Sequence, residues 1–292
     1  MNGKTMLLIV GGVVLVIAIA LVALLLPVQK SAKPIAVEQT TIEPAQEVAM
    51  EPTNTAKQAA LLPTEQTTTT VTFPTTDNLT VTADLYWTGD ANAAFILLFH
   101  QADYSRGEYL EIAPKLNALG YNCLAIDQRS GGGVNDIINE TYKAAKAAGL
   151  PTSYTDAYAD LQSALSYVES TYAPRKLIVW GSSYSSSLAL ILASQHPDEI
   201  AAVLAFSPGE YFKLDGKKVA DYAANITQPA FITSAKSEGK SWRGIADQIK
   251  SAGSVFFVPE GNGRHGSSAL FEKTANSAEY WTAVEQFLAS LK

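Results

Sequence analysis

Short apolar runs that alternate with helix-like segments constrain the fold of this chain more than any other feature of its sequence. Mainly apolar runs, each short enough for a strand, cover residues 94–99, 121–127, 176–180, 201–206 and 230–234. Helix-like patterns lie between or after them at 109–119, 156–171, 185–195, 242–251 and 278–291. Strands without polar alternation are buried on both faces, so the pattern predicts an α/β fold with a mostly parallel sheet covered by helices. Reactive groups should gather at the carboxyl ends of the strands.

The first seventy residues differ from the rest of the chain. Residues 6–26 form an uncharged apolar run of 21 residues, which is a bilayer-spanning length. We therefore expect residues 1–28 to be an uncleaved transmembrane signal anchor that displays the remainder outside the cytoplasm. Residues 29–70 contain four prolines, a Thr67–Thr70 run and no aromatic residue, which predicts a flexible linker. The folded domain should then span residues 71–292.

Charge and cysteine content exclude several classes of function. The net charge is −7 and the five arginines are scattered, which argues against nucleic-acid binding. The single cysteine, Cys123, allows no intramolecular disulfide and no cysteine-based zinc site, and its apolar neighbours predict a buried packing role. The sequence has no phosphate-binding glycine loop and no His-x-x-x-His pair. We expect neither a metal nor a cofactor.

The segment between the run at 176–180 and the following helix contains a Gly-x-Ser-x-small motif. Ser183 has Gly181 two residues before it and Ser185 two residues after it. A nucleophilic serine on a sharp strand-to-helix turn needs small residues at both places, because the backbone is crowded there. Ser182 would place the bulky Trp180 in that position, and Ser185 as the nucleophile would lie inside the helix. The alternative reading is a serine-rich helix N-cap.

A serine nucleophile needs an imidazole base, and the chain has three histidines. His196 follows the helix at 185–195 and is expected to be structural. His100 ends the run at 94–99, where its side chain can fix a nearby loop. His265 lies in a glycine-rich loop after the last predicted strand, the short run at 254–258, and from this loop a base can reach the serine. His265 is the predicted general base.

With these motifs, residues 71–292 resemble an α/β-hydrolase of the small dienelactone-hydrolase and esterase type. The resemblance rests on the segments 97–102, 127–132, 181–185 and 265–266. Gln101 and Ser185 depart from the family, which usually has glycine at both positions. The resemblance implies a serine hydrolase whose oxyanion-hole amides belong to Tyr184 and Ala102, with Gln101 as the neighbouring possibility.

The carboxylate that orients the base is less well determined by the sequence. Glu238, after the run at 230–234, occupies the position where this family usually has aspartate. Its rival is Glu210, after the run at 201–206, and Asp215 and Asp221 remain further candidates. Asp127 is expected to be a structural residue that connects loops beneath the site.

Loop lengths and the predicted serine, histidine and acid limit the class of substrate only broadly. The interval 207–228 is too short for a helical cap domain, so the cleft should be open unless the excursion 130–152, with a predicted helix at 139–148, covers it. The expected reaction is hydrolysis of a small carboxylic ester or thioester through an acyl-enzyme. The alternatives are a peptidase-type serine hydrolase and a membrane-tethered, non-catalytic binding module on the same scaffold.

Overall fold

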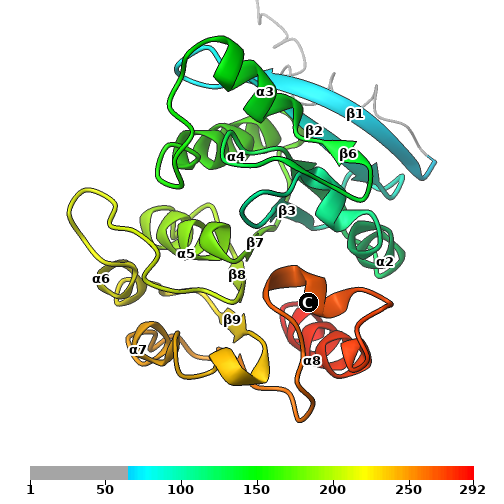
Figure 1. Cartoon of the computed structure of the whole chain (residues 1–292). Coiled ribbons are helices and arrows are strands. Elements are labelled where there is room, and N and C mark those ends of the chain that lie inside the picture. The colour runs from blue at the N-terminus through cyan, green and yellow to red at the C-terminus, as the bar shows by residue number, and fades with distance from the viewer. Residues whose placement is uncertain (1–64) are drawn as a thin grey trace, which may run out of the picture. The chain divides into compact units, whose positions relative to one another are not determined.

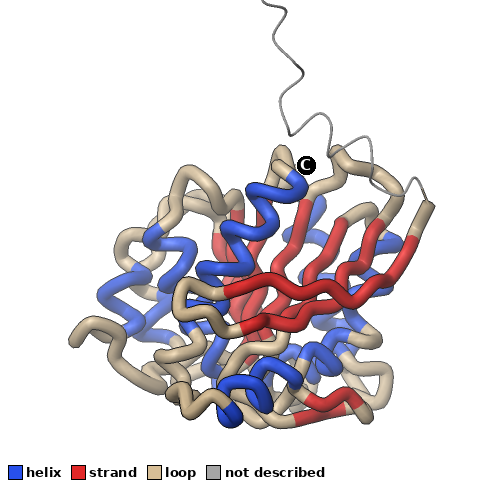
Figure 2. The backbone as a smooth tube through the Cα atoms, turned by 90° about the horizontal axis from the view of Figure 1, so that it is seen from above, coloured by secondary structure: helices blue, strands red, loops and turns tan. Residues whose placement is uncertain are grey.

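A central eight-stranded sheet organises residues 65–292, the part of the chain that the computed structural model describes (Figure 1). The strands are β1 (Thr67–Pro74), β2 (Thr80–Trp87), β3 (Phe95–Phe99), β4 (Asn122–Ile126), β7 (Leu177–Ser182), β8 (Ala202–Phe206), β9 (Ala230–Thr233) and β10 (Val255–Phe257). Their spatial order is β1-β2-β4-β3-β7-β8-β9-β10, and Figure 2 shows the sheet from above. The β1–β2 and β2–β4 pairs are antiparallel and the others are parallel. The predicted mostly parallel sheet is confirmed.

Helices cover both faces of this sheet (Figure 1). They are α2 (Ile112–Ala118), α3 (Glu140–Ala147), α4 (Tyr158–Tyr172), α5 (Tyr184–Gln195), α6 (Val219–Ala223), α7 (Arg243–Ala246) and α8 (Ser277–Ser290), with short 3₁₀ turns η1 (Arg106–Tyr109), η2 (Lys236–Glu238) and η3 (Gly266–Leu270). One apolar core joins the sheet to α4, α5, α6 and α7, and a second joins it to α2 and α8. Every residue of β3, β4, β7, β8 and β9 is buried, as expected for strands between two helical layers.

Several elements differ in extent from the sequence-based prediction. The helix predicted at 109–119 is divided into η1 and α2, and the one at 242–251 is reduced to α7. The short helix α6 lies in the interval for which only a loop was expected. β1 begins at Thr67, so the last four residues of the predicted linker belong to a strand that pairs with β2 over its whole length. Those threonines are β-branched, which suits an edge strand.

The excursion 130–152 contains a small hairpin and the predicted helix. β5 (Gly133–Val134) and β6 (Ile137–Ile138) pair with each other, and α3 follows, with Asn139 accepting a hydrogen bond at its N-terminus from the Tyr142 amide. The hairpin contacts η1 and α3 contacts β2, so the excursion packs at the β1–β2 side of the sheet (Figure 1).

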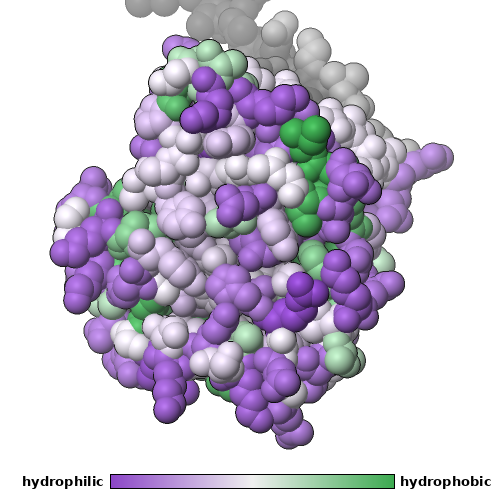
Figure 3. Space-filling view, in the orientation of Figure 1, coloured by the Kyte–Doolittle hydropathy of each residue, from purple (hydrophilic) through white to green (hydrophobic). Residues whose placement is uncertain are grey.

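The predicted membrane anchor, residues 1–28, lies outside the described residues, as does most of the predicted linker. Within residues 65–292, no helix has both the length and the apolar character needed to cross a bilayer. On the face shown in Figure 3, polar residues cover most of the surface and hydrophobic residues form only small groups. Anchoring and display outside the cytoplasm remain predictions from the sequence.

Candidate active site

The turn between β7 and α5 holds Ser183 in a backbone conformation that is rare for a residue with a side chain. Its φ is 56° and its ψ is −124°. Gly181 has no room for a side chain, because a Cβ there would lie 2.4 Å from the Ser185 carbonyl oxygen. The Ser185 hydroxyl accepts a hydrogen bond from the Ser182 amide (3.0 Å) and donates one to the Phe99 carbonyl (2.7 Å). Serine is therefore accommodated where relatives usually have glycine.

Three of the predicted site residues are brought together from three separate loops. The Ser183 hydroxyl lies 2.7 Å from His265 Nε2, and His265 Nδ1 lies 2.7 Å from Glu238 Oε1. With Nδ1–H donating to the carboxylate, Nε2 is left to accept the serine proton. The His265 side chain is 41% exposed and that of Glu238 is 29% exposed, so both can be reached from solvent.

Glu238 lies in η2, directly after β9, and is held on two sides. Its Oε1 contacts His265, and its Oε2 accepts a hydrogen bond of 2.7 Å from the Ser207 hydroxyl. Burial alone would raise the pKa of Glu238, but the hydrogen bonds from His265 and Ser207 outweigh it and lower the pKa below its ordinary value. The carboxylate is consequently charged at neutral pH, as is needed to orient an imidazole.

Ser207 is a residue of the site that the sequence analysis missed. It follows β8 with a φ of 56°, and its hydroxyl also accepts the Gly266 amide at 2.9 Å. The same side chain thus fixes the acid and the loop of the base. A serine directly after a buried strand, followed by Pro208, was the available signal in the sequence.

The other acids considered for the triad have different partners. Glu210 accepts the Val219 amide (2.7 Å) and the Ala220 amide (2.9 Å) at the start of α6. Asp221 accepts the Lys218 amide at 2.8 Å, at the same helix end, and Asp215 lies in a turn with a φ of 49°. Among these four acids, only Glu238 accepts a hydrogen bond from His265. Glu210 is therefore a helix-capping residue, and the alternative acid is not supported.

The loop after β3 supplies one candidate oxyanion amide and excludes another. The Gln101 amide donates to Glu108 Oε2 at 2.8 Å, so it is already engaged and the expectation that it could serve as a donor is wrong. The Ala102 amide makes no hydrogen bond within residues 65–292. Tyr184 begins α5, and the first amides of a helix have no partner within it. Ala102 and Tyr184 thus remain the candidate pair of oxyanion donors.

Two partly exposed tyrosines contact Ser183 or its neighbour Tyr184. Tyr154 stacks on Tyr184, with ring centroids 4.4 Å apart, and 37% of Tyr154 is exposed. The Tyr211 hydroxyl donates to the Ser207 carbonyl at 2.8 Å. Burial raises the pKa of Tyr211, while a contact with the Ser183 side chain lowers it, which places this phenol against the nucleophile.

His100 has the predicted structural role. It is fully buried; Nδ1 donates to the Gln101 carbonyl (2.7 Å), and Nε2 accepts from the Gln128 amide (3.0 Å) and lies 3.1 Å from Asn139 Nδ2. Burial lowers the pKa of His100 to about 4, so the ring is neutral at pH 7. His196, the third histidine, ends α5 and contacts Glu199.

Glu108 is a buried acid beneath the turn that carries Ser183, and the sequence analysis did not single it out. Its Oε1 accepts a hydrogen bond of 2.8 Å from the Ser182 hydroxyl, in addition to the Gln101 amide on Oε2. Burial raises the pKa of this carboxyl to about 7, although the Gln101 and Ser182 hydrogen bonds lower it. Its position between Gly107 and Tyr109 in a polar segment gave no sign of burial.

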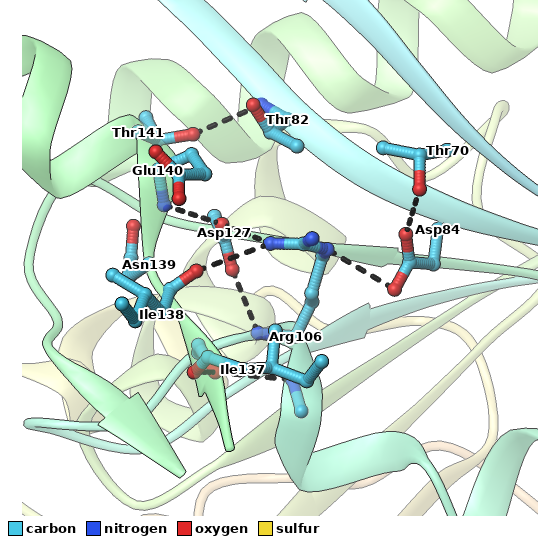
Figure 4. A network of polar contacts seen from close by, with 12 residues as sticks. Thr70, Thr82, Asp84, Arg106, Asp127, Ile137, Ile138, Asn139, Glu140 and Thr141 are labelled. Carbon is cyan, nitrogen blue, oxygen red and sulfur yellow. Dashed lines mark hydrogen bonds and ion pairs between the residues drawn. The ribbon is translucent and has the colours of Figure 1, made fainter. Parts of the chain in front are cut away.

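Asp127 connects loops on the β1–β2 side, as predicted (Figure 4). It accepts hydrogen bonds from the Arg106 amide, the Arg106 guanidinium and the Glu140 amide, each at 2.8 Å. Arg106 also pairs with Asp84 at 3.0 Å. Arg106 therefore lies between two carboxylates, and the network fixes η1 and α3 to the sheet. Cys123, in β4, is fully buried as expected.

No group of three His, Cys, Asp or Glu side chains able to hold a metal ion occurs within residues 65–292. The described site is a hydrogen-bonded serine, histidine and carboxylate, with the Ala102 and Tyr184 amides as candidate oxyanion donors. Such an arrangement can deprotonate a hydroxyl and stabilise an oxyanion, which are the requirements of acyl transfer.

Comparison with known proteins gives a family and a set of similar folds. Residues 90–250, more than half of the chain, match the model of the family described as serine aminopeptidase, S33. No curated protein sequence gives a significant match.

Among solved structures, an esterase from Pyrococcus furiosus superposes with a TM-score of 0.59 at 17% identity, covering 83% of this chain and 97% of that one. A dienelactone hydrolase from Anabaena variabilis gives 0.61 at 14% identity, covering 77% and 98%. A carboxyl esterase from Bacillus coagulans gives 0.60 at 11% identity, covering 78% and 99%. At these identities the likeness establishes the fold.

Proposed function

The chain belongs to the serine aminopeptidase S33 family of α/β-hydrolases, and we propose that it cleaves small carboxylic esters or thioesters through a Ser183–His265–Glu238 triad. The observation that carries the proposal is the continuous hydrogen-bonded path from Ser183 through His265 to Glu238, with 2.7 Å at both steps. Solved structures of similar fold include esterases and dienelactone hydrolases, which supports an ester substrate.

In the proposed mechanism, His265 Nε2 takes the hydroxyl proton as Ser183 Oγ attacks the substrate carbonyl carbon. Glu238 stabilises the imidazolium that forms, and the amides of Tyr184 and Ala102 bind the oxyanion. His265 then returns the proton to the leaving alcohol or thiol, so that an acyl-enzyme remains. Water, deprotonated by the same imidazole, releases the acid and restores Ser183.

The test is the intact mass of the full-length chain after treatment with a fluorophosphonate. We expect one adduct on the wild type, mapped to Ser183 by peptide mass spectrometry. Ser183→Ala should abolish the adduct and Glu238→Ala should slow its formation. Ser194→Ala, in the helix α5 that follows Ser183, is the matched control and should label like the wild type; within residues 65–292 its hydroxyl is hydrogen-bonded only to the Ile191 carbonyl. A folded wild type that takes no label would refute the mechanism and favour the non-catalytic binding module.

The family description favours peptide bonds as a second candidate substrate class. An amide requires His265 to protonate a poorer leaving group, but it uses the same residues. Rates on aminoacyl 4-nitroanilides and on 4-nitrophenyl esters, compared on one preparation, separate the two candidates. We expect a higher kcat/KM on the esters, and a preference for the anilides would make the chain a peptidase.

A further inference from the structure

Two consecutive amides after His265 are fixed in the same manner. The Gly266 amide donates to the Ser207 hydroxyl (2.9 Å), which donates to Glu238 (2.7 Å). The next amide, that of Ser267, begins a second chain of hydrogen bonds through other residues. The loop that carries the base is thus attached at two successive positions, and one of the attachments ends on the proposed triad acid.

The second path ends on Glu108. The Ser267 amide donates to the Ser182 hydroxyl (2.8 Å), which donates to Glu108 Oε1 (2.8 Å). Ser267, Ser182 and Glu108 are fully buried. Gly266 packs so closely here that a Cβ would lie 2.4 Å from Ser182 Oγ. Because water does not reach these buried groups, no water molecule can replace a hydrogen bond that is lost from this path.

The Glu108 carboxylate also contacts the loop after β3, which contains the proposed oxyanion donor Ala102. Glu108 Oε2 accepts the Gln101 amide at 2.8 Å, and Oε1 lies 3.3 Å from the Gln101 side-chain nitrogen. Gln101 directly precedes Ala102. One carboxyl group therefore joins the loop after β3, the turn after β7 and the loop after β10, which supply the oxyanion amide, the nucleophile and the base.

We propose that Glu108 is a positioning residue that holds the Ala102 amide and the His265 loop in register with Ser183, and thereby sets kcat. The inference rests on the proposed function. Reacting groups displaced by about 1 Å can lose roughly 10²-fold in rate, so a rigid connection among the three loops has a direct kinetic consequence. Glu108 touches neither Ser183 nor His265 by a hydrogen bond, so it acts through Ser182 and Gln101.

Glu108→Gln is a sharp test, because both carboxyl oxygens accept hydrogen bonds from N–H groups. With its NH₂ group at the Oε2 position, a glutamine would face the Gln101 amide, which can only donate; at the Oε1 position it would face the Ser182 hydroxyl and the Gln101 side chain, which must both turn to accept and so give up their present hydrogen bonds. Ser182→Ala breaks the path at its middle and leaves Glu108 in place. If both residues act through one path, the double variant should be no slower than the slower single variant.

The matched control is Thr141→Val. The Thr141 hydroxyl is buried and accepts the amide of Thr82, a residue far away in sequence, at 2.9 Å, as Ser182 accepts Ser267 (Figure 4). It lies in the Asp127 network, away from the proposed triad. Its loss should lower stability without changing kcat, and so measures the purely structural effect of removing a buried hydroxyl.

The experiment is steady-state hydrolysis of 4-nitrophenyl acetate by the full-length wild type and the four variants. A separate sample of the wild type is treated with a fluorophosphonate to show that Ser183 is reactive. We expect kcat about tenfold lower or more in Glu108→Gln and Ser182→Ala, KM within about twofold, and no further loss in the double variant. If Glu108→Gln does not fold, Ser182→Ala alone carries the test.

Wild-type kcat in Ser182→Ala, a rise in KM without a fall in kcat, or multiplying losses in the double variant would overturn the positioning role. A loss of kcat of equal size in Thr141→Val would overturn it too. A wild type that takes no label refutes the proposed function instead, so the two failures are distinguishable.

Discussion

Two sets of the same three residue types lie at the carboxyl edge of the sheet, one accessible and one buried. Ser183, His265 and Glu238 form the more accessible set: Ser183 is 8% exposed, and the histidine and glutamate side chains are 41% and 29% exposed. Ser182, His100 and Glu108 form the buried set, and all three have no exposed surface. The serines of the two sets, Ser182 and Ser183, are adjacent in the sequence.

Solvent access, rather than residue type, distinguishes the proposed catalytic residues from the structural ones in this protein. The accessible histidine has a serine hydroxyl on one nitrogen and a carboxylate on the other. The buried histidine has both nitrogens occupied by backbone and amide groups, and burial lowers its pKa to about 4. A group without solvent access and without a free nitrogen cannot exchange protons with a substrate, so it can only hold structure.

Substitution of each histidine should reveal the largest difference between the accessible and the buried set. His265→Ala should lower kcat by roughly 10³- to 10⁴-fold with little change in thermal stability, because it removes the general base from a half-exposed site. His100→Gln should lower the free energy of unfolding by about 2 kcal/mol, since the Gln128 amide loses its acceptor, while kcat changes far less. Kinetics on 4-nitrophenyl acetate and urea unfolding measure both. Equal kinetic losses in the two variants would contradict the division.

The carboxylates provide the next test. Glu238→Gln should lower kcat by about 10²-fold or more, because the amide cannot stabilise the imidazolium as the carboxylate does. The folded state should persist, since the side chain is partly exposed. The kcat of this variant is to be compared with that of Glu108→Gln, for which the expected loss is smaller. If Glu238→Gln kept wild-type kcat, another acid would have to orient His265.

The pH dependence of stability should reveal the buried histidine. The pKa of His100 is about 4 in the folded state, against 6.5 ordinarily, so between pH 6.5 and 4 the unfolded chain binds more protons. The stability contributed by neutral His100 is therefore complete above pH 6.5 and is lost as the pH falls toward 4, by about 3 kcal/mol.

Glu108 acts in the opposite direction. Its pKa is raised from 4.5 to about 7, so its contribution is present below pH 4.5 and is lost as the pH rises through 7. The difference between wild type and His100→Gln, from urea unfolding at pH 4 to 7, isolates the His100 contribution. That difference should shrink as the pH falls, whereas a constant difference would show that His100 does not titrate as its burial requires.

The smallest expected effect distinguishes Glu238 from its rival. Glu210→Gln should leave kcat unchanged and lower the free energy of unfolding by about 0.5 to 1 kcal/mol, because Glu210 accepts the Val219 and Ala220 amides at the N-terminus of α6. Thermal unfolding and ester hydrolysis of the same preparation check both statements. A fall in kcat comparable with that of Glu238→Gln would return Glu210 to the list of acids.

Local sequence determined much of this protein because its rules act over a few residues. The apolar runs predicted the parallel strands, since a strand between two helical layers has no polar face. The spacing of Gly181 and Ser183 predicted the tight turn, and the structure shows the crowding at Gly181 that excludes any side chain. His265 followed by elimination among three histidines and by its place after the last predicted strand.

Tertiary structure alone decided which acid meets His265 and which polar residues are buried. Glu238 and Glu210 both follow strands, and only the path of the chain after β9 brings one of them within 2.7 Å of the imidazole. Glu108 sits in a polar segment, and its burial depends on Ser182, 74 residues away. Such contacts join segments whose separation in space is set by the packing of the whole sheet, which no local pattern encodes.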